Sequence, residues 1–181
     1  MVTREQALAV LDSADLICSA EIVAAAIDRV ALEISAELSE RYPVVLSVMG
    51  GAIMFAGQLL PKLRFPLDLD YIHATRYRNT TQGHDIDWRV LPKADIKGRV
   101  VLVLDDILDE GRTLEAVRLK LLEMGVTEFY SAVLAVKETG QPKPIHADFA
   151  GLTLPNRYVF GCGMDVKGLW RNLPEIYALK D

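Results

Sequence analysis

The chain has 181 residues, of which 51% are hydrophobic and 25% are charged, and its formal net charge at pH 7 is −5. This length and apolar content predict a single domain over residues 1–181 with a sizeable core. The negative net charge argues against a general nucleic-acid binder, whose surface is usually basic, and no apolar run is long enough to cross a membrane.

The first third of the chain predicts two helices, a strand and a third helix. Residues 3–6 fit a capping box at the start of a short helix, and Ser19 can cap a longer one. Apolar residues at helical spacing over 22–38 predict the longer helix, which must end before Pro43. The apolar run 44–49 predicts a buried strand, and Gly50-Gly51 then turns the chain into an apolar helix that ends near Pro61.

Strand patterns dominate the remainder. Alternation over 67–72 predicts a strand, the polar segment 76–84 predicts a long loop, and 88–91 resume a strand. Five apolar residues at 100–104 predict a buried parallel strand, and apolar residues at helical spacing from Leu114 predict the helix after it. Further strands are predicted over 129–136, 149–154 and 158–160.

Strands that alternate with helices predict an open, mostly parallel α/β sheet. Ligands of such sheets bind at the carboxyl ends of the strands. Met49-Gly50-Gly51, the segment 105–113 and Lys137 all follow predicted strands. We therefore expect these three segments to meet at one edge of the sheet and to form one site.

The segment 105–113 reads Asp-Asp-Ile-Leu-Asp-Glu-Gly-Arg-Thr and carries the most informative chemistry. Backbone N–H groups at the start of the following helix predict an anion site. The aspartates beside it can hold ribose hydroxyls or Mg²⁺. The spacing fits neither a P-loop nor a dinucleotide fingerprint. The alternative is an acidic loop that merely caps the helix.

This segment resembles the phosphoribosyl-pyrophosphate signature of the type I phosphoribosyltransferases. After about Val44, the order of features resembles the hypoxanthine-guanine phosphoribosyltransferases. The resemblance implies an open, mostly parallel sheet flanked by helices, with a small hood formed from the chain termini. It implies transfer of a phosphoribosyl group from 5-phospho-α-D-ribose 1-diphosphate (PRPP) to hypoxanthine or guanine, which makes IMP or GMP and releases pyrophosphate.

The resemblance also implies roles for the residues that hold the sugar and its phosphate. Asp105 and Asp106 would bind the ribose hydroxyls, directly or through Mg²⁺, and Asp165 would serve a second Mg²⁺. The Thr113 hydroxyl would help to hold the 5′-phosphate. Backbone amides would cradle the same phosphate at Glu110, Gly111, Arg112 and Thr113.

Further implied roles concern the leaving group. Met49 and Gly50 match a loop that contacts pyrophosphate through its main chain, and Arg171 matches a pyrophosphate-binding arginine. The segment from Arg76 and Tyr77 onwards matches a mobile lid, which would exclude water from the reaction.

The remaining implied roles concern the purine. Asp109 would lie near N7 and take or share its proton, which makes N9 more nucleophilic. Lys137 would donate to the 6-oxo group and thereby disfavour a 6-amino group. Tyr158 would stack on the base, and Val159 would add a main-chain contact.

Three positions depart from the pattern of the family. Glu110 stands where Thr or Ser is usual, so its carboxylate must point away from the phosphate. Met49 replaces a Lys or Arg found in some relatives. Arg76 stands where Ser is frequent before the lid tyrosine, and it could partly replace the charge missing at Met49.

Other readings remain open at this point. The chain could transfer a phosphoribosyl group to xanthine or another base, because Lys137 does not settle the 2-position. It could instead be a nucleotide-sensing regulator, although the negative charge and Asp109 argue against one. We expect small-molecule substrates without nucleic-acid or membrane partners, and a homodimer or homotetramer.

The cysteines and histidines of the sequence do not indicate a disulfide, a metal site or a catalytic group. Cys18 and Cys162 are too few and too distant to suggest a disulfide framework or metal site, so we expect buried free thiols and a cytoplasmic protein. The first residues do not resemble a secretory signal. His73, His84 and His146 show no ligand spacing, and we expect them to be structural or solvent-exposed.

Overall fold

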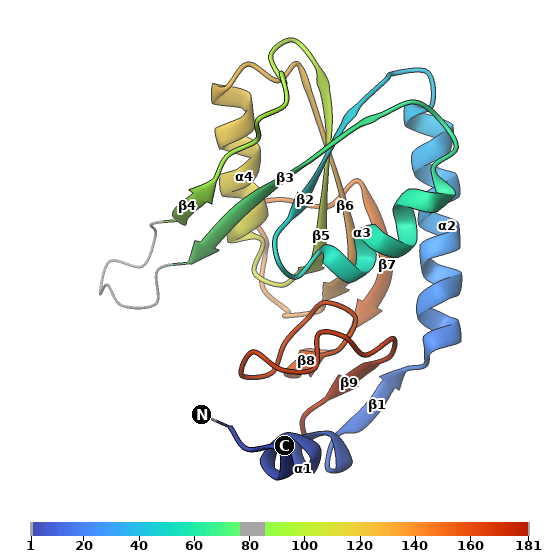
Figure 1. Cartoon of the computed structure of the whole chain (residues 1–181), viewed down its shortest axis with the longest axis vertical. Helices are drawn as coiled ribbons and strands as arrows, with labels where there is room; N and C mark the ends of the chain where they lie inside the picture. The colour runs from blue at the N-terminus through green and yellow to red at the C-terminus, as the bar shows by residue number, and fades with distance from the viewer. Residues whose placement is uncertain (1, 77–85, 181) are drawn as a thin grey trace.

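The computed structural model describes residues 2–76 and 86–180 and contains two sheets (Figure 1). The larger sheet has six strands in the order β4-β3-β2-β5-β6-β7. Four neighbouring pairs are parallel, and β4 pairs with β3 in the antiparallel sense at one edge. The strands are β2 (Val44–Val48), β3 (Asp68–Arg76), β4 (Ile86–Val90), β5 (Val100–Leu108), β6 (Glu128–Lys137) and β7 (Phe149–Leu154).

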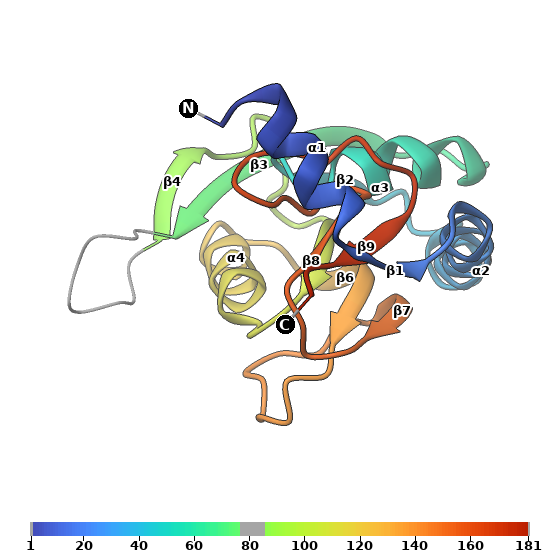
Figure 2. The ribbon, with the colours of Figure 1, turned by 90° about the horizontal axis from the view of Figure 1, so that it is seen from below.

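Helices cover both faces of this sheet (Figure 2). On one face lie α2 (Ala20–Leu38) and α3 (Ile53–Leu59), the latter extended by a 3₁₀ turn over Leu60–Lys62. On the other face lies α4 (Arg112–Glu123). The Ser19 side chain caps α2 as predicted, by accepting a hydrogen bond from the N–H of Ile22. Each large apolar side chain that these helices bury stabilises the fold by about 1.5–3 kcal/mol.

The smaller sheet joins the two ends of the chain and forms the predicted hood. It has the order β1-β9-β8, with β1 at Asp15–Cys18, β8 at Val159–Phe160 and β9 at Ile176–Ala178. The short helix α1 (Arg4–Asp12) lies beside it (Figure 1) and carries the predicted capping box between Thr3 and Gln6. Arg157 fastens the hood, because its guanidinium donates to Asp15 Oδ2 at 2.6 Å and to the carbonyl of Leu179 at 2.7 Å.

The structure differs from the sequence-based prediction at three places. The signature strand β5 continues through Leu108 rather than ending at residue 104, so Asp105 and Asp106 belong to the strand. Its pairing with β6 explains the difference, since Asp105 is opposite Val133 and Leu108 is opposite Val136. The short strands β1 and β9 were not predicted. Arg76 ends β3, and the rest of the predicted loop lies outside the described residues.

Both cysteines are buried free thiols, as predicted. Burial raises the pKa of Cys162 to about 11, so this thiol carries its proton at neutral pH. Within residues 2–76 and 86–180, every helix is too short or too polar to span a bilayer.

The strand order places a crevice at the middle of the larger sheet. From β2 the chain moves outward to β3, whereas from β5 it moves in the opposite direction to β6 and then β7. The order therefore reverses between β2 and β5. Open α/β sheets bind their ligands outside the carboxyl ends of the strands at such a reversal. The turn at 49–51 follows β2, and the segment 105–113 comprises the end of β5 and the residues directly after it.

Candidate active site

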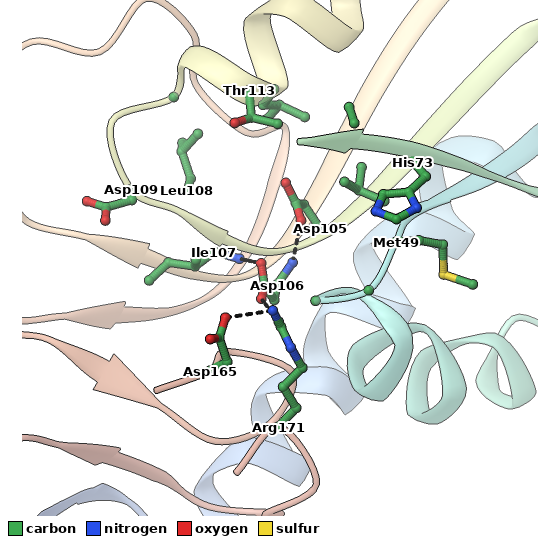
Figure 3. Close-up of a pocket in the computed structure, with 16 residues that line it drawn as sticks. Met49, His73, Asp105, Asp106, Ile107, Leu108, Asp109, Thr113, Asp165 and Arg171 are labelled. Carbon is green, nitrogen blue, oxygen red and sulfur yellow. Dashed lines mark hydrogen bonds and ion pairs between the residues drawn. The ribbon is translucent and has the colours of Figure 1, made fainter. Parts of the chain in front are cut away.

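A cavity of about 340 Å³ lies at this reversal (Figure 3). Its walls come from the ends of β2, β3 and β5, from the start of α4, and from the hood. The predicted residues that line it come from separate parts of the sequence: Met49, Gly50, Asp105, Asp106, Asp109, Gly111, Thr113, Asp165 and Arg171.

Two neighbouring carboxylates occupy the floor of the cavity. Asp105 is 9% exposed, and its Oδ1 accepts a hydrogen bond from the N–H of Asp106 at 3.0 Å. Asp106 Oδ1 in turn accepts from the N–H of Ile107 at 2.8 Å. The strand thus fixes both side chains through its own backbone, and it leaves oxygen atoms available to a ligand.

Burial raises the pKa of both carboxyls. The pKa of Asp105 lies well above its usual range because the group is desolvated and because Asp106 stands beside it. The pKa of Asp106 is also raised by burial, although backbone hydrogen bonds and the charge of Arg171 act in the opposite direction. A ligand that donates hydrogen bonds from hydroxyls, or that brings positive charge, would offset the free-energy cost of burying these two carboxylates.

We predict that Asp105→Asn stabilises the ligand-free protein increasingly as pH rises. The folded wild type holds protons that the unfolded chain, with an ordinary Asp pKa of about 3.9, has lost. Its free energy of unfolding therefore falls as pH rises through the raised folded pKa values. Asn can keep the hydrogen bond from Asp106 without a buried charge, and each kcal/mol gained raises the Tm by about 2–4 °C.

Thermal unfolding of both proteins between about pH 4 and pH 8 tests this prediction, since this window begins at the ordinary Asp pKa. Asp28→Asn is the matched control, because that carboxylate is 61% exposed in a surface ion pair. A Tm difference for Asp105→Asn that does not grow with pH would contradict the prediction.

Glycine at position 51 lets the first turn approach the carboxylates closely. A Cβ at Gly51 would lie 2.1 Å from Asp106 Oδ2, so any larger residue would displace that side chain. The preceding peptide bond, between Met49 and Gly50, is cis. Met49 belongs to the lining of the cavity, and its side chain points away from Asp105 and Asp106 (Figure 3).

The start of α4 offers backbone N–H groups to the cavity. Gly111 precedes the helix with φ of 81°, a conformation that glycine adopts without steric cost. Glu110 and Arg112 form an ion pair with each other, at 3.5 Å, and both side chains are more than half exposed. The Glu110 side chain is therefore turned toward the surface, and Glu110 is not among the residues that line the cavity.

Arg171 brings a positive charge from the hood. Its Nη2 pairs with Asp165 Oδ1 at 2.6 Å, and its Nη1 donates to the carbonyl of Gly163 at 2.5 Å and lies 4.0 Å from Asp106 Oδ2. The second oxygen of Asp165 accepts from the N–H of Gly168 at 2.7 Å. The hood thus holds Arg171 over the carboxylates of the sheet.

A second cavity, of about 190 Å³, adjoins the first and contains the predicted base-binding residues. Lys137 ends β6, is 13% exposed in its side chain, and pairs with Asp109 Oδ2 at 2.8 Å. Val159 is buried, whereas Tyr158 is 54% exposed and donates its hydroxyl to the carbonyl of Asp165 at 3.2 Å. An exposed aromatic ring and a largely buried ammonium therefore line the same space.

Two predicted lid residues cannot be placed in this site. Tyr77 lies outside the described residues, and Arg76 is described only by its backbone, which pairs with Ile86.

Two residues near the site were missed by the sequence analysis. Lys143, from the β6–β7 connection, donates to the carbonyls of Leu108 and Asp109 and so braces the signature segment. No sequence signal indicated this contact.

His73 is the second residue that was missed, because its default prediction as structural or solvent-exposed gave it no place in the site. It is half-buried and lines the larger cavity. The available signal was its position directly after the predicted strand 67–72, at the edge of the sheet where ligands bind.

Comparisons with known proteins agree with this geometry. A family model for the phosphoribosyl transferase domain matches residues 13–167. The hypoxanthine-guanine phosphoribosyltransferase of Streptococcus pneumoniae is 32% identical over 86% of this chain and 89% of its own length. The hypoxanthine-guanine-xanthine phosphoribosyltransferase of Tritrichomonas foetus is 34% identical over 82% of this chain and 84% of its own.

A solved structure gives the same result for the fold. The hypoxanthine-guanine phosphoribosyltransferase of Bacillus anthracis superposes with a TM-score of 0.85 at 25% identity, over 92% of this chain and 98% of its own. The sheet order, the site at its reversal and these relatives lead to one assignment. The chain belongs to the phosphoribosyl transferase family, among the hypoxanthine-guanine phosphoribosyltransferases.

Proposed function

We propose that this chain transfers the 5-phosphoribosyl group of PRPP to N9 of hypoxanthine or guanine and releases pyrophosphate. The observation that carries this proposal is the pair of adjoining cavities. They share Asp106, Ile107, Asp109 and Asp165, so a ligand in one abuts a ligand in the other. One has the groups that suit a phosphorylated sugar, and the other has those that suit a purine.

The larger cavity would hold PRPP. N–H groups of residues 110–113, at the positive end of α4, suit the 5′-phosphate, and the Thr113 hydroxyl can add a donor. Asp105 and Asp106 would accept from the ribose hydroxyls. Arg171 would neutralise charge on the departing pyrophosphate, and main-chain groups at Met49 and Gly50 would contact it.

The smaller cavity would hold the base. A 6-oxopurine presents O6 and N7 side by side on one edge. Lys137 and Asp109, paired at 2.8 Å, would meet this edge together, with Lys137 donating to O6 and Asp109 accepting the proton of N7. Tyr158 would stack on the ring, and Val159 would contact its other edge.

The donor set fits Mg²⁺ brought in with PRPP. Among the described residues, no three His, Cys, Asp or Glu side chains converge to hold a metal by themselves. Mg²⁺ is typically held by one or two carboxylates together with substrate phosphates and water. Asp105 and Asp106 would supply those carboxylates, and Asp165 would supply a third oxygen for a second ion. Bound Mg²⁺ would neutralise the negative charge that develops on the diphosphate.

A purine panel tests the proposed function. Each base is mixed with PRPP, and pyrophosphate release is measured with the nucleotide product identified by chromatography. Hypoxanthine and guanine are expected to react. Xanthine belongs in the panel because the Tritrichomonas foetus relative is named for it. No release with any 6-oxopurine would refute the proposal.

Removal of Mg²⁺ is expected to abolish this activity. Exhaustive chelation followed by titration with MgCl₂ should restore turnover in proportion to the Mg²⁺–PRPP complex. Asp106→Asn should need more Mg²⁺ for half-maximal rate, whereas the surface control Asp28→Asn should not. Undiminished turnover after chelation would count against the metal and leave the base assignment intact.

Three further predictions remain proposals. We propose that residues 1–181 form one phosphoribosyltransferase domain and that it works in the cytoplasm. A homodimer or homotetramer is also proposed, and exposed apolar side chains on β3 and α3, at Leu69, Tyr71 and Ile53, offer surface for such contacts. Light scattering of the purified protein measures the oligomer directly.

A further inference from the structure

Negative charge outweighs positive charge among the described residues of the larger cavity. Its lining includes four carboxylates, those of Asp105, Asp106, Asp109 and Asp165. Arg171 contributes a guanidinium to the same lining. The ammonium of Lys137 lies in the adjoining cavity and is paired with Asp109. A diphosphate group that enters this cavity therefore depends strongly on each hydrogen-bond donor that the walls provide.

Three of the described lining side chains carry an N–H or O–H donor: His73, Thr113 and Arg171. Thr113 belongs to the start of α4, and in Figure 3 it lies on the other side of Asp105 from His73. Arg171 already donates to the carbonyl of Gly163 and to Asp165. The imidazole of His73 is thus the side-chain donor beside the turn at 49–51.

Strand pairing explains why His73 reaches this position. Val48 is opposite Ile72 in the parallel β2–β3 pair, and the N–H of Met49 donates to the carbonyl of Ile72 at 2.8 Å. His73 therefore lies beside Met49, directly after the last residue of β3 that pairs with β2. On its other side, the pairing of β3 with β4 shifts register between His73 and Ala74. Such irregularities re-aim side chains and occur frequently beside active sites.

The ring of His73 is free to bind a ligand. Figure 3 shows it extending from β3 into the space between Met49 and Asp105. Within residues 2–76 and 86–180, its nitrogens have no hydrogen bond or ion pair. Met49 beside it offers only an apolar side chain, so His73 supplies the side-chain donor that this corner otherwise lacks.

We propose that His73 binds the diphosphate of PRPP by donating a hydrogen bond from its ring. This inference rests on the proposed function and adds a residue to it. The nucleoside monophosphate product keeps the 5′-phosphate, the ribose and the base but has no diphosphate. His73 therefore contacts PRPP and pyrophosphate but not the nucleotide.

His73→Ala tests this proposal through three ligands. Calorimetry with Mg²⁺ present measures the affinities for PRPP, pyrophosphate and IMP, and steady-state kinetics give KM and kcat. We expect the affinities for PRPP and pyrophosphate to fall about tenfold, which corresponds to about 1.4 kcal/mol. The affinity for IMP should change less than twofold. His73→Gln, which keeps an amide donor, should lose less than His73→Ala.

His146→Ala is the matched control, because His146 is exposed on the β6–β7 connection. It should leave all three affinities unchanged. PRPP and pyrophosphate affinities within twofold of wild type in His73→Ala would overturn the proposal. An equal loss for IMP and pyrophosphate would also overturn it, since that pattern indicates a structural role for His73.

These outcomes are separate from those of the proposed function. The purine panel with wild-type protein decides whether the chain is a 6-oxopurine transferase. Pyrophosphate binding by calorimetry needs no turnover and decides whether His73 contacts a diphosphate. An active wild type with an unaffected His73→Ala variant would overturn the role of His73 and leave the function standing.

Discussion

Lys137→Met is expected to remove most activity with hypoxanthine and guanine while PRPP binding stays near the wild-type value. The ammonium of Lys137 is largely buried at the end of β6 and can donate to the 6-oxo oxygen of these bases. Met fills a similar volume but has no donor. The 6-oxo group would then be desolvated without a partner, at a cost of about 1–3 kcal/mol. That cost is about a ten- to hundredfold loss in kcat/KM.

The same reasoning predicts the response to adenine. Adenine presents an amino group at position 6, so in the wild type a donor would face the ammonium donor of Lys137. We therefore expect almost no activity with adenine, and a smaller preference for hypoxanthine over adenine in Lys137→Met. The measurement is kcat/KM for hypoxanthine, guanine and adenine in both proteins, with the dissociation constant of PRPP from calorimetry.

A surface lysine provides the control for this substitution. Lys62→Met removes an ammonium that forms an ion pair with Asp28, and the Lys62 side chain is 39% exposed. Such surface ion pairs contribute little to stability. It should leave kinetics and base preference unchanged. If the wild type uses adenine as well as hypoxanthine, or if Lys137→Met keeps the base preference of the wild type, Lys137 does not select between a 6-oxo and a 6-amino purine.

The sequence predicted those parts of the fold that depend on local patterns. The strands 44–49, 129–136 and 149–154 and the caps at Thr3 and Ser19 all match the structure closely, because burial and capping act over a few residues. Burial alone could not locate the end of β5. Two aspartates continue that strand because β6 pairs with it up to Leu108, a partnership between segments distant in sequence.

The hood illustrates the same limit. Asp15 pairs with Ala178, at opposite ends of the chain, and the two strands are short. A three- or four-residue segment carries too little periodicity to predict a strand without knowledge of its partner. The resemblance to a family supplied the hood, whereas the residue pattern did not.

Within the candidate site, the sequence predicted residues that follow strands in a recognisable motif. Asp105, Asp106 and Asp109 come from one continuous segment, and Lys137 ends a clear apolar strand. Lys143 lacked such a signal, and His73 had only its position after the predicted strand 67–72, outside any motif. Each reaches the site through a contact between distant segments, His73 beside Met49 and Lys143 on the carbonyls of Leu108 and Asp109.

Asp109→Asn is expected to give the largest loss of turnover among the variants considered. Asp109 lines both cavities and pairs with Lys137, so it would lie between a base in the smaller cavity and a sugar in the larger one. A carboxylate that accepts the N7 proton increases the electron density at N9 as the new bond forms. General acid–base assistance of this kind contributes about 100- to 10,000-fold to rate. Asn has the same shape but cannot take a proton, so kcat should fall by a factor in that range.

Binding of PRPP should survive the substitution, because Asn keeps an oxygen that can accept from Lys137 and does not alter the backbone of the signature segment. Kinetics at saturating substrates, PRPP calorimetry and thermal unfolding measure the three quantities separately, with Asp28→Asn as the surface control. A 7-deaza analogue of hypoxanthine adds an internal check, since its C–H at position 7 has no acidic proton to share. With that base, wild type and Asp109→Asn should turn over at similar slow rates. Equal kcat for the two proteins with hypoxanthine itself would show that Asp109 is not the base, because N7 would then gain nothing from its carboxylate.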